Sequence, residues 1–225
     1  FHDMEQIVAA GGDGTVRIGL VPSVSSLLFP LLPQVLAQTF PRLRVEFHDQ
    51  TNDALVRELQ SGQIDFGIGA IDSSLPAALQ VYPLREDPFV AVLHGDDPLA
   101  DQPHLPWKLL AGRDIAVFSK GNIQRLVGAL AESHRLTLNT RFQVDYIETL
   151  YGLVRSRLAI AILPELYTTH LQDPVLKIAQ LQQPALARTV AIMRGPQPLP
   201  PLIEQCFTLL LNSLRESSAR LRADV

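Results

Sequence analysis

The chain contains few of the residues from which redox or metal chemistry is built. Its 225 residues include one cysteine, Cys206, so no disulfide can form within the chain. The six histidines are scattered, without HxxxH or HxH spacing and without partner cysteines, so we expect no metal site. The single thiol fits a reducing cytoplasm, where we expect the protein to act. Cys206 falls beside the apolar stripe of the last predicted helix, and we interpret it as a partly buried, inert thiol.

A long apolar run and a basic surface are also missing. No stretch reaches the ~18 uninterrupted apolar residues of a membrane span, and polar residues near the start interrupt any signal-peptide core. The formal net charge is −4, whereas surfaces that neutralise phosphates are usually basic. Hydrophobic residues make up 47% of the chain, enough for a sizeable core. We therefore expect one or two globular domains without membrane contact.

Motifs of the common catalytic sites are absent as well. The sequence has neither a G-x-S-x-G elbow nor a G-x-x-x-x-G-K-[ST] loop, and Ser119-Lys120 lacks the S-x-x-K spacing of a nucleophile pair. Gly67 and Gly69 form a GxG inside an apolar stretch, where close packing of a helix is the expected reason for them. These absences favour a binding module over an enzyme, with no catalytic residue and no cofactor.

The most informative stretch is VRIGLVPSVSSLLFPLLPQVLAQTFP, residues 16–41. Its alternating start predicts a short strand that stops at Pro22, and residues 28–36 then carry apolar side chains at helical spacing. Unpaired N–H groups and the helix dipole at such a helix start suit a carboxylate beside Ser23 and Ser25. The equally open alternative is that a serine only caps the helix.

Two further prolines stand within this predicted helix. We expect Pro30 and Pro33 to lie in its opening turns, where a missing N–H costs least. If the helix instead starts at Ser25, the two prolines interrupt it and a kink is expected.

The rest of the chain alternates between predicted strands and helices. Strands are expected at 43–47 and 64–71, with a helix between them that begins at Thr51 or Asn52. A second strand–helix series starts at residue 114, and an amphipathic helix closes the chain. The order β-α-β-α-β in both halves predicts an α/β protein with parallel strands and two similar lobes.

Polar residues follow the predicted strands in both halves, at the strand ends where α/β proteins bind ligands. The first half contributes Ser23, Ser25, Thr51 and Asn52, and the second half contributes Ser119, Lys120, Asn122 and Tyr146. Lys120 would supply a point charge for an anion, unless it is simply a solvated loop lysine.

Five segments in this order resemble the C-terminal effector-binding domain of LysR-type transcriptional regulators, from about Gly14 to Leu214. The matching segments are VRIGLVPS, LLFPLLPQVLAQTFPRLRVEF, LVRELQSGQIDFGIGA, EDPFVAVLHGDDPLA and LYGLVRSRLAIAILPEL. The resemblance implies a ligand-sensing regulatory domain that binds a small organic effector, a carboxylate or an aromatic acid, in a cleft between two subdomains.

The same resemblance implies the architecture and the site. It implies two Rossmann-like subdomains of the type 2 periplasmic-binding-protein kind, joined by crossover strands near 89–93 and 189–193. Residues 1–12 would end a linker helix, residues 13–89 and 189–225 would form subdomain I, and residues 90–188 would form subdomain II. By position, the family's cleft residues fall on Ser23, Ser25, Asn52, Ala70, Gly121, Asn122 and Ile123. Four residues that follow predicted strands are expected to join this effector site: Thr51, Ser119, Lys120 and Tyr146.

Two positions depart from the family pattern. Ala70 offers no charge where some relatives place a basic residue, which argues against a doubly anionic effector. Residues 157–160, RLAI, stand where the family often has GLGI. Because glycine favours the left-handed conformation at a helix end, we expect this helix to close differently.

Partners also follow from the resemblance. The family's winged helix-turn-helix domain would precede residue 1, so this chain is expected to reach DNA only through that absent domain. Family members pair through the first subdomain, which implies a homodimer, with a tetramer as the alternative at full length. The alternative function is a periplasmic solute-binding protein of a transporter. A third interpretation, an enzyme similar to prephenate dehydratase or porphobilinogen deaminase, lacks a catalytic cluster.

Overall fold

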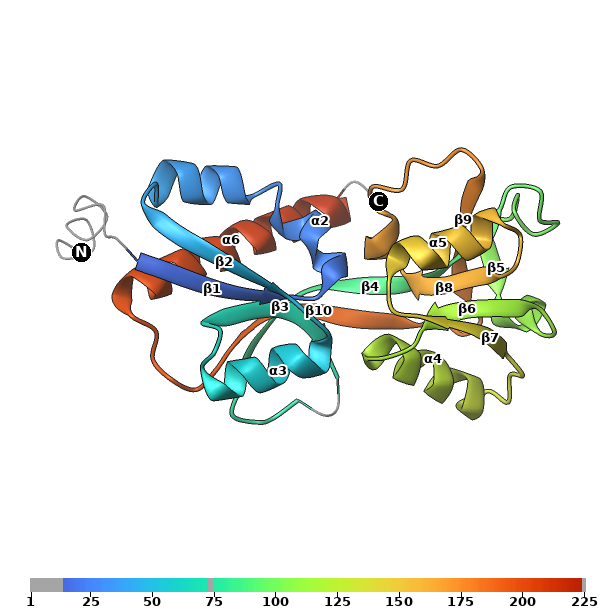
Figure 1. Cartoon of the computed structure of the whole chain (residues 1–225), viewed down its shortest axis with the longest axis horizontal. Helices are drawn as coiled ribbons and strands as arrows, with labels where there is room; N and C mark the ends of the chain where they lie inside the picture. The colour runs from blue at the N-terminus through green and yellow to red at the C-terminus, as the bar shows by residue number, and fades with distance from the viewer. Residues whose placement is uncertain (1–13, 73–74, 224–225) are drawn as a thin grey trace. The chain divides into compact units, whose positions relative to one another are not determined.

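The computed structural model describes residues 14–72 and 75–223, so the linker helix predicted at residues 1–12 lies outside them. The chain divides into two compact units, the first made of Phe1–Arg85 with Thr189–Val225 and the second of Glu86–Arg188. Strands β4 (Gln80–His94) and β10 (Ala187–Arg194) each contribute residues to both units (Figure 1). They contain residues 89–93 and 189–193, where the resemblance implies the crossovers, but within β4 the change from one unit to the other falls between Arg85 and Glu86.

The first unit is built on a sheet with the strand order β2-β1-β3-β10, in which β1, β2 and β3 are parallel and β10 is antiparallel to β3. Its strands and helices are β1 (Gly14–Leu20), the 3-10 turn η1 (Pro22–Val24), α2 (Ser25–Leu28), the π-type turn η2 (Pro33–Ala37), β2 (Leu43–Asp49), α3 (Asn52–Ser61), β3 (Phe66–Ile71) and α6 (Pro201–Ala223). The apolar run predicted as a buried strand is β3, and all but its last residue are buried. The predicted apolar face of α6 is also buried, Phe207 and Leu210 included.

Local sequence signals set both ends of α3. Thr51 is the N-cap, and its Oγ1 accepts the N–H of Ala54 at 3.4 Å. Gly62 ends the helix with φ 71°, the left-handed conformation that glycine adopts without steric cost. The helix predicted between these residues is therefore confirmed.

The helix predicted after Pro22 is interrupted. Pro22 occupies the first position of η1, but α2 ends at Leu28 and the chain turns through residues 29–31 before η2 begins at Pro33. Pro30 thus lies in the break and not in an opening turn, because without an N–H it cannot continue the α-helical bonding. Pro33, in contrast, occupies the first position of η2, as expected for a proline in an opening turn. The two prolines thus have different outcomes, since only Pro30 interrupts the helical segment.

Three glycines let α3 lie close to the sheet. A Cβ atom on Gly19 would stand 2.4 Å from Leu55 Cδ1, one on Gly67 would stand 2.5 Å from the same atom, and one on Gly69 would stand 2.5 Å from Leu55 Cδ2. Leu55 is fully buried, so it has little room to yield. The prediction that the GxG serves helix packing is confirmed.

The second unit has a mixed sheet in which β6, β7 and β8 are parallel and β4 pairs antiparallel with β8 and β9. Its own strands and helices are β5 (His104–Pro106), the 3-10 turn η3 (Trp107–Leu110), β6 (Asp114–Phe118), α4 (Asn122–Ser133), β7 (Asn139–Val144), α5 (Ile147–Arg155), β8 (Ile160–Pro164), the 3-10 turn η4 (Glu165–Thr168) and β9 (Leu176–Gln182). The second β-α-β-α-β series is confirmed. Since β7 and β8 lie on opposite sides of β6, right-handed crossovers place α4 and α5 on opposite faces of the sheet (Figure 1).

The end of α5 differs from expectation. Arg157 itself adopts the left-handed conformation, with φ 59°, and the Leu158 N–H donates to the Leu153 carbonyl at 3.0 Å, the closure usually made with glycine. The prediction of a different closure is therefore wrong. The Arg157 guanidinium forms an ion pair with Asp96, which gives the side chain a partner in this less favourable backbone conformation.

Candidate functional site

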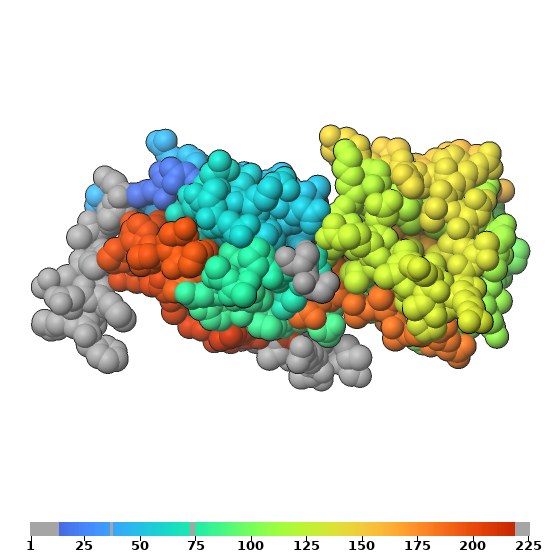
Figure 2. All heavy atoms as spheres, turned by 90° about the horizontal axis from the view of Figure 1, so that it is seen from below, coloured from blue at the N-terminus to red at the C-terminus, as the bar shows by residue number. Residues whose placement is uncertain are grey.

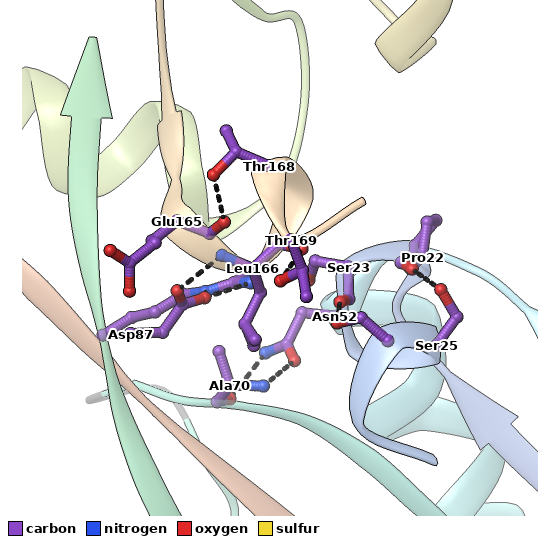
Figure 3. Close-up of polar contacts among 12 residues, drawn as sticks. Pro22, Ser23, Ser25, Asn52, Ala70, Asp87, Glu165, Leu166, Thr168 and Thr169 are labelled. Carbon is purple, nitrogen blue, oxygen red and sulfur yellow. Dashed lines mark hydrogen bonds and ion pairs between the residues drawn. The ribbon is translucent and has the colours of Figure 1, made fainter. Parts of the chain in front are cut away.

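In the first unit, two of the predicted residues are in direct contact. Asn52, at the first position of α3, donates from Nδ2 to the Ala70 carbonyl at 3.0 Å, and its Oδ1 accepts the Ala70 N–H at 2.8 Å (Figure 3). Asn52 is only 4% exposed. Its amide therefore fixes the end of β3 to the start of α3.

Ser23 and Ser25 lie in the short helical turns after β1, and neither of them is an N-cap. The N-caps of η1 and α2 are Val21 and Val24, and no side chain makes a capping bond at either start. Instead, the Ser25 hydroxyl donates back to the Pro22 carbonyl at 2.8 Å (Figure 3). The capping interpretation is therefore wrong, and α2, with four residues, offers little of the dipole that the anion-binding interpretation requires.

In the second unit, Gly121, Asn122 and Ile123 form the start of α4. Gly121 is the N-cap with φ 88°, and no side chain caps the helix. Asn122 is 4% exposed, and its Nδ2 has no hydrogen-bond partner among the described residues. A buried donor without a partner costs about 1–3 kcal/mol, and the first N–H groups of the 12-residue helix add further donors. This end of α4 therefore favours a hydrogen-bond acceptor, above all an anion.

The remaining predicted residues gather around a carboxylate that the sequence analysis missed. Asp145 accepts a short hydrogen bond from the Ser119 hydroxyl and stands 3.9 Å from Lys120 Nζ. The Lys120 side chain is 75% exposed, and Tyr146 is 76% exposed. Asp145 could have been found from the sequence, because it follows β7 as Ser119 follows β6, and these parallel strands are neighbours. Asp145 offsets the charge that Lys120 was expected to supply.

A buried ion pair joins the two crossover strands within the second unit. Arg188 on β10 donates from Nε and Nη2 to Asp87 Oδ2 on β4, at 2.9 and 2.8 Å. Asp87 Oδ1 accepts the N–H of Leu166, the second residue of η4, at 3.0 Å (Figure 3). Asp87 is fully buried and Arg188 is 3% exposed. This pair could not be predicted from the sequence, because its members are 101 residues apart.

Comparison with known proteins places the chain in a family. Residues 9–215 match the family described as the LysR substrate binding domain. The chain belongs to this family. The DNA-binding transcriptional dual regulator OxyR of Escherichia coli K12 is 31% identical over 155 residues, which cover 68% of this chain and 50% of that protein. This LysR substrate binding domain thus spans about half the length of the curated relatives it matches.

Solved structures agree with this assignment. The reduced form of OxyR matches with a TM-score of 0.73 and 26% identity, covering 91% of this chain and 95% of that one. The regulatory domain of Synechocystis CcmR in complex with 2-PG matches with a TM-score of 0.80 and 17% identity, covering 92% and 98%. The fold is the periplasmic-binding-protein-like type 2 fold, and the chain is a LysR-type regulatory domain. No finding supports the alternative of a transporter's solute-binding protein.

The one cysteine of this LysR-type domain is buried. Cys206 lies on α6 with none of its surface exposed, and burial, with a smaller contribution from Asp65, raises the pKa of its thiol to about 12. The thiol is therefore protonated at neutral pH and weakly nucleophilic, as the sequence predicted. It is also more deeply buried than predicted.

Two negative findings concern the described residues only. No group of three or more His, Cys, Asp or Glu side chains in residues 14–72 and 75–223 is arranged to hold a metal ion. No helix in the same ranges combines the length and apolar character of a bilayer-spanning segment.

Proposed function

We propose that this domain senses a small organic acid with a single negative charge and that the start of α4 receives its carboxylate. The observation that carries the proposal is the buried Nδ2 of Asn122, which lacks a partner beside an uncapped helix start. A carboxylate oxygen would satisfy this donor and the adjacent N–H groups together. Ala70 brings no charge, and Asp145, 3.9 Å from Lys120 Nζ, offsets the charge of this lysine, so the site favours a single carboxylate over two.

The other predicted residues would complete the effector site. These are Ser23, Ser25, Thr51, Asn52 and Ala70 of the first unit, and Ser119, Lys120, Gly121, Ile123 and Tyr146 of the second. Binding would regulate by favouring one conformation of the domain through its higher affinity for the acid. The full-length protein would carry this change to DNA through a winged helix-turn-helix before residue 1, in the cytoplasm and without catalysis.

Replacing Asn122 with leucine tests the acid site. The variant removes a buried donor that has no partner, so its melting temperature should equal or exceed that of the wild type. A thermal-shift screen of small organic acids first finds an acid that stabilises the wild type. Calorimetry should then show binding of that acid weakened by about ten-fold or more in the variant.

Asn139→Leu is the matched control for this experiment. Asn139 is exposed and donates to Asp114 at 2.7 Å in the same unit, so its removal should leave acid binding unchanged. If the Asn122 variant binds the acid as tightly as the wild type, the start of α4 does not hold the carboxylate.

We also propose that the domain forms a homodimer through its first unit, with a tetramer as the alternative at full length. In the described chain, β2 is the outer strand of this unit's sheet, and it carries Phe47, which is 36% exposed. Phe29, 45% exposed, packs edge to face on Phe47 with the ring centroids 5.3 Å apart. Two exposed aromatic rings beside an open strand edge suit a second copy of the chain.

Phe47→Glu should weaken this dimer. The substitution removes an apolar ring from each of the two copies and adds a charge, so the dissociation constant should rise by about 100-fold. Sedimentation velocity over a concentration series measures the change. Leu109→Glu is the control, because Leu109 is 37% exposed but lies in the second unit. Equal dissociation constants for the wild type and the Phe47 variant would place the interface elsewhere.

A further inference from the structure

The second unit has a cavity that none of the effector-site residues lines. It measures about 560 Å³ and lies between α4, the end of β6, β7 and the turn that joins α4 to β7. Its apolar lining consists of Val117, Val127, Gly128, Ala131, Leu136 and Leu138. The face of the unit on which α4 lies is turned towards the viewer in Figure 2, in yellow-green. The volume is typical of cavities that hold small molecules.

A glycine in the middle of α4 opens this cavity. Gly128 has a helical and not a left-handed φ, and a Cβ atom placed on it would meet nothing within 4 Å. Neither backbone conformation nor close packing therefore requires glycine, although glycine weakens a helix interior. The absence of a side chain at Gly128 leaves space in the cavity.

The polar groups of the cavity are few, and most of them are neutral. Gln124, Thr137, Thr140 and Gln143 contribute amide and hydroxyl groups, and Arg125 is the one charged residue in the described lining. Arg125 already has an interaction of its own. An apolar wall with neutral hydrogen-bonding groups suits an uncharged molecule with one or two polar atoms better than an acid.

We propose that this cavity is a second ligand site, which takes a small, uncharged and mostly apolar molecule such as a single or fused aromatic ring with one polar group. The site shares α4 with the start of the effector site, since Asn122 opens the helix and Ala131 lines the cavity near its other end. Through this shared helix, a cavity ligand that shifts α4 would change the affinity for acid at Asn122, and the acid would then change the affinity for that ligand by the same factor. This coupling rests on the proposed acid site, whereas the proposal of a ligand site in the cavity is independent of the acid site.

The test uses indole as the ligand and detects its binding by two-dimensional ¹H–¹⁵N NMR of the 225-residue chain. Millimolar indole should shift the amide signals of residues 127–131 and 136–140 in a saturable way. Gly128→Leu should weaken this binding by about ten-fold or more, because the new side chain fills the cavity. The melting temperature of the variant should not fall, because leucine is the better helix former.

Gly152→Leu is the matched control. Gly152 lies inside α5, a Cβ atom on it would also meet nothing within 4 Å, and it does not line the cavity. The Gly152→Leu variant should bind indole as tightly as the wild type does. The Asn122→Leu variant should also bind indole as tightly as the wild type, which would show that the indole site and the acid site are separate. Absence of saturable shifts, shifts confined to residues 119–123, or equal affinity in Gly128→Leu would each overturn the proposal. An acid affinity that indole leaves unchanged would overturn the coupling.

Discussion

Replacing Asp87 with alanine is expected to lower the free energy of unfolding of the second unit by about 3–5 kcal/mol. The change removes the carboxylate that accepts two hydrogen bonds from Arg188, whose guanidinium stays buried in the variant. It also leaves the Leu166 N–H, at the start of η4, without its acceptor. Urea unfolding measures the loss through the fluorescence of Trp107, the single tryptophan, which is fully buried in this unit.

Two further variants test whether burial is the cause. Asp114→Ala removes an ion pair with Arg141 at 2.7 Å and the hydrogen bond from Asn139 at 2.7 Å. These contacts lie at the surface, so their loss should cost about 1 kcal/mol or less. Replacing Asp87 and Arg188 together by leucine should recover much of the stability, because an apolar pair leaves no buried charge uncompensated. Similar losses for Asp87→Ala and Asp114→Ala would contradict this account.

Asn52→Ala is expected to cost the first unit about 2–4 kcal/mol, because it leaves both the N–H and the carbonyl of Ala70 unsatisfied in a buried place. The two affected hydrogen bonds are local, so hydrogen exchange is the direct measurement. The Ala70 amide should exchange faster than the amides of its neighbours on β3. Urea unfolding followed by circular dichroism gives the total cost.

The neighbouring Thr51→Ala variant is the control for Asn52. It removes the cap of the same helix, a change that typically costs about 1 kcal/mol, but it leaves the Ala70 hydrogen bonds intact. A loss no larger for Asn52→Ala than for Thr51→Ala would mean that the contact with Ala70 contributes little.

Signals carried by neighbouring residues predicted much of the fold. Three such signals each determine the structure of only a few neighbouring residues. They are the alternation at residues 16–20, the capping residues Thr51 and Gly62, and the apolar run that ends at Ile71. The role of Gly67 and Gly69 could also be predicted, because a glycine inside a buried strand often marks the close approach of a neighbouring element.

Other features depend on contacts that no local pattern contains. The Asp87–Arg188 pair forms only once β4 and β10 lie side by side, and neither residue has a local feature that marks it. Strand β9 (Leu176–Gln182) was not predicted, since it alternates weakly and is defined by its pairing with β4. The unpaired amide of Asn122 likewise depends on the tertiary structure, because the sequence shows a donor but not what surrounds it. Pro30 and Pro33 allowed two outcomes, and only the structure decided between them.

The order in which the two units are completed during synthesis follows from the division of the chain. The second unit is one continuous segment, Glu86–Arg188, inserted into the first. When a ribosome has made residue 188, the second unit has its whole sequence, whereas the first still lacks most of β10 and all of α6. The unit that begins first is therefore finished last. A nascent chain must hold β1, β2 and β3 without their last partner strand until the remaining residues emerge.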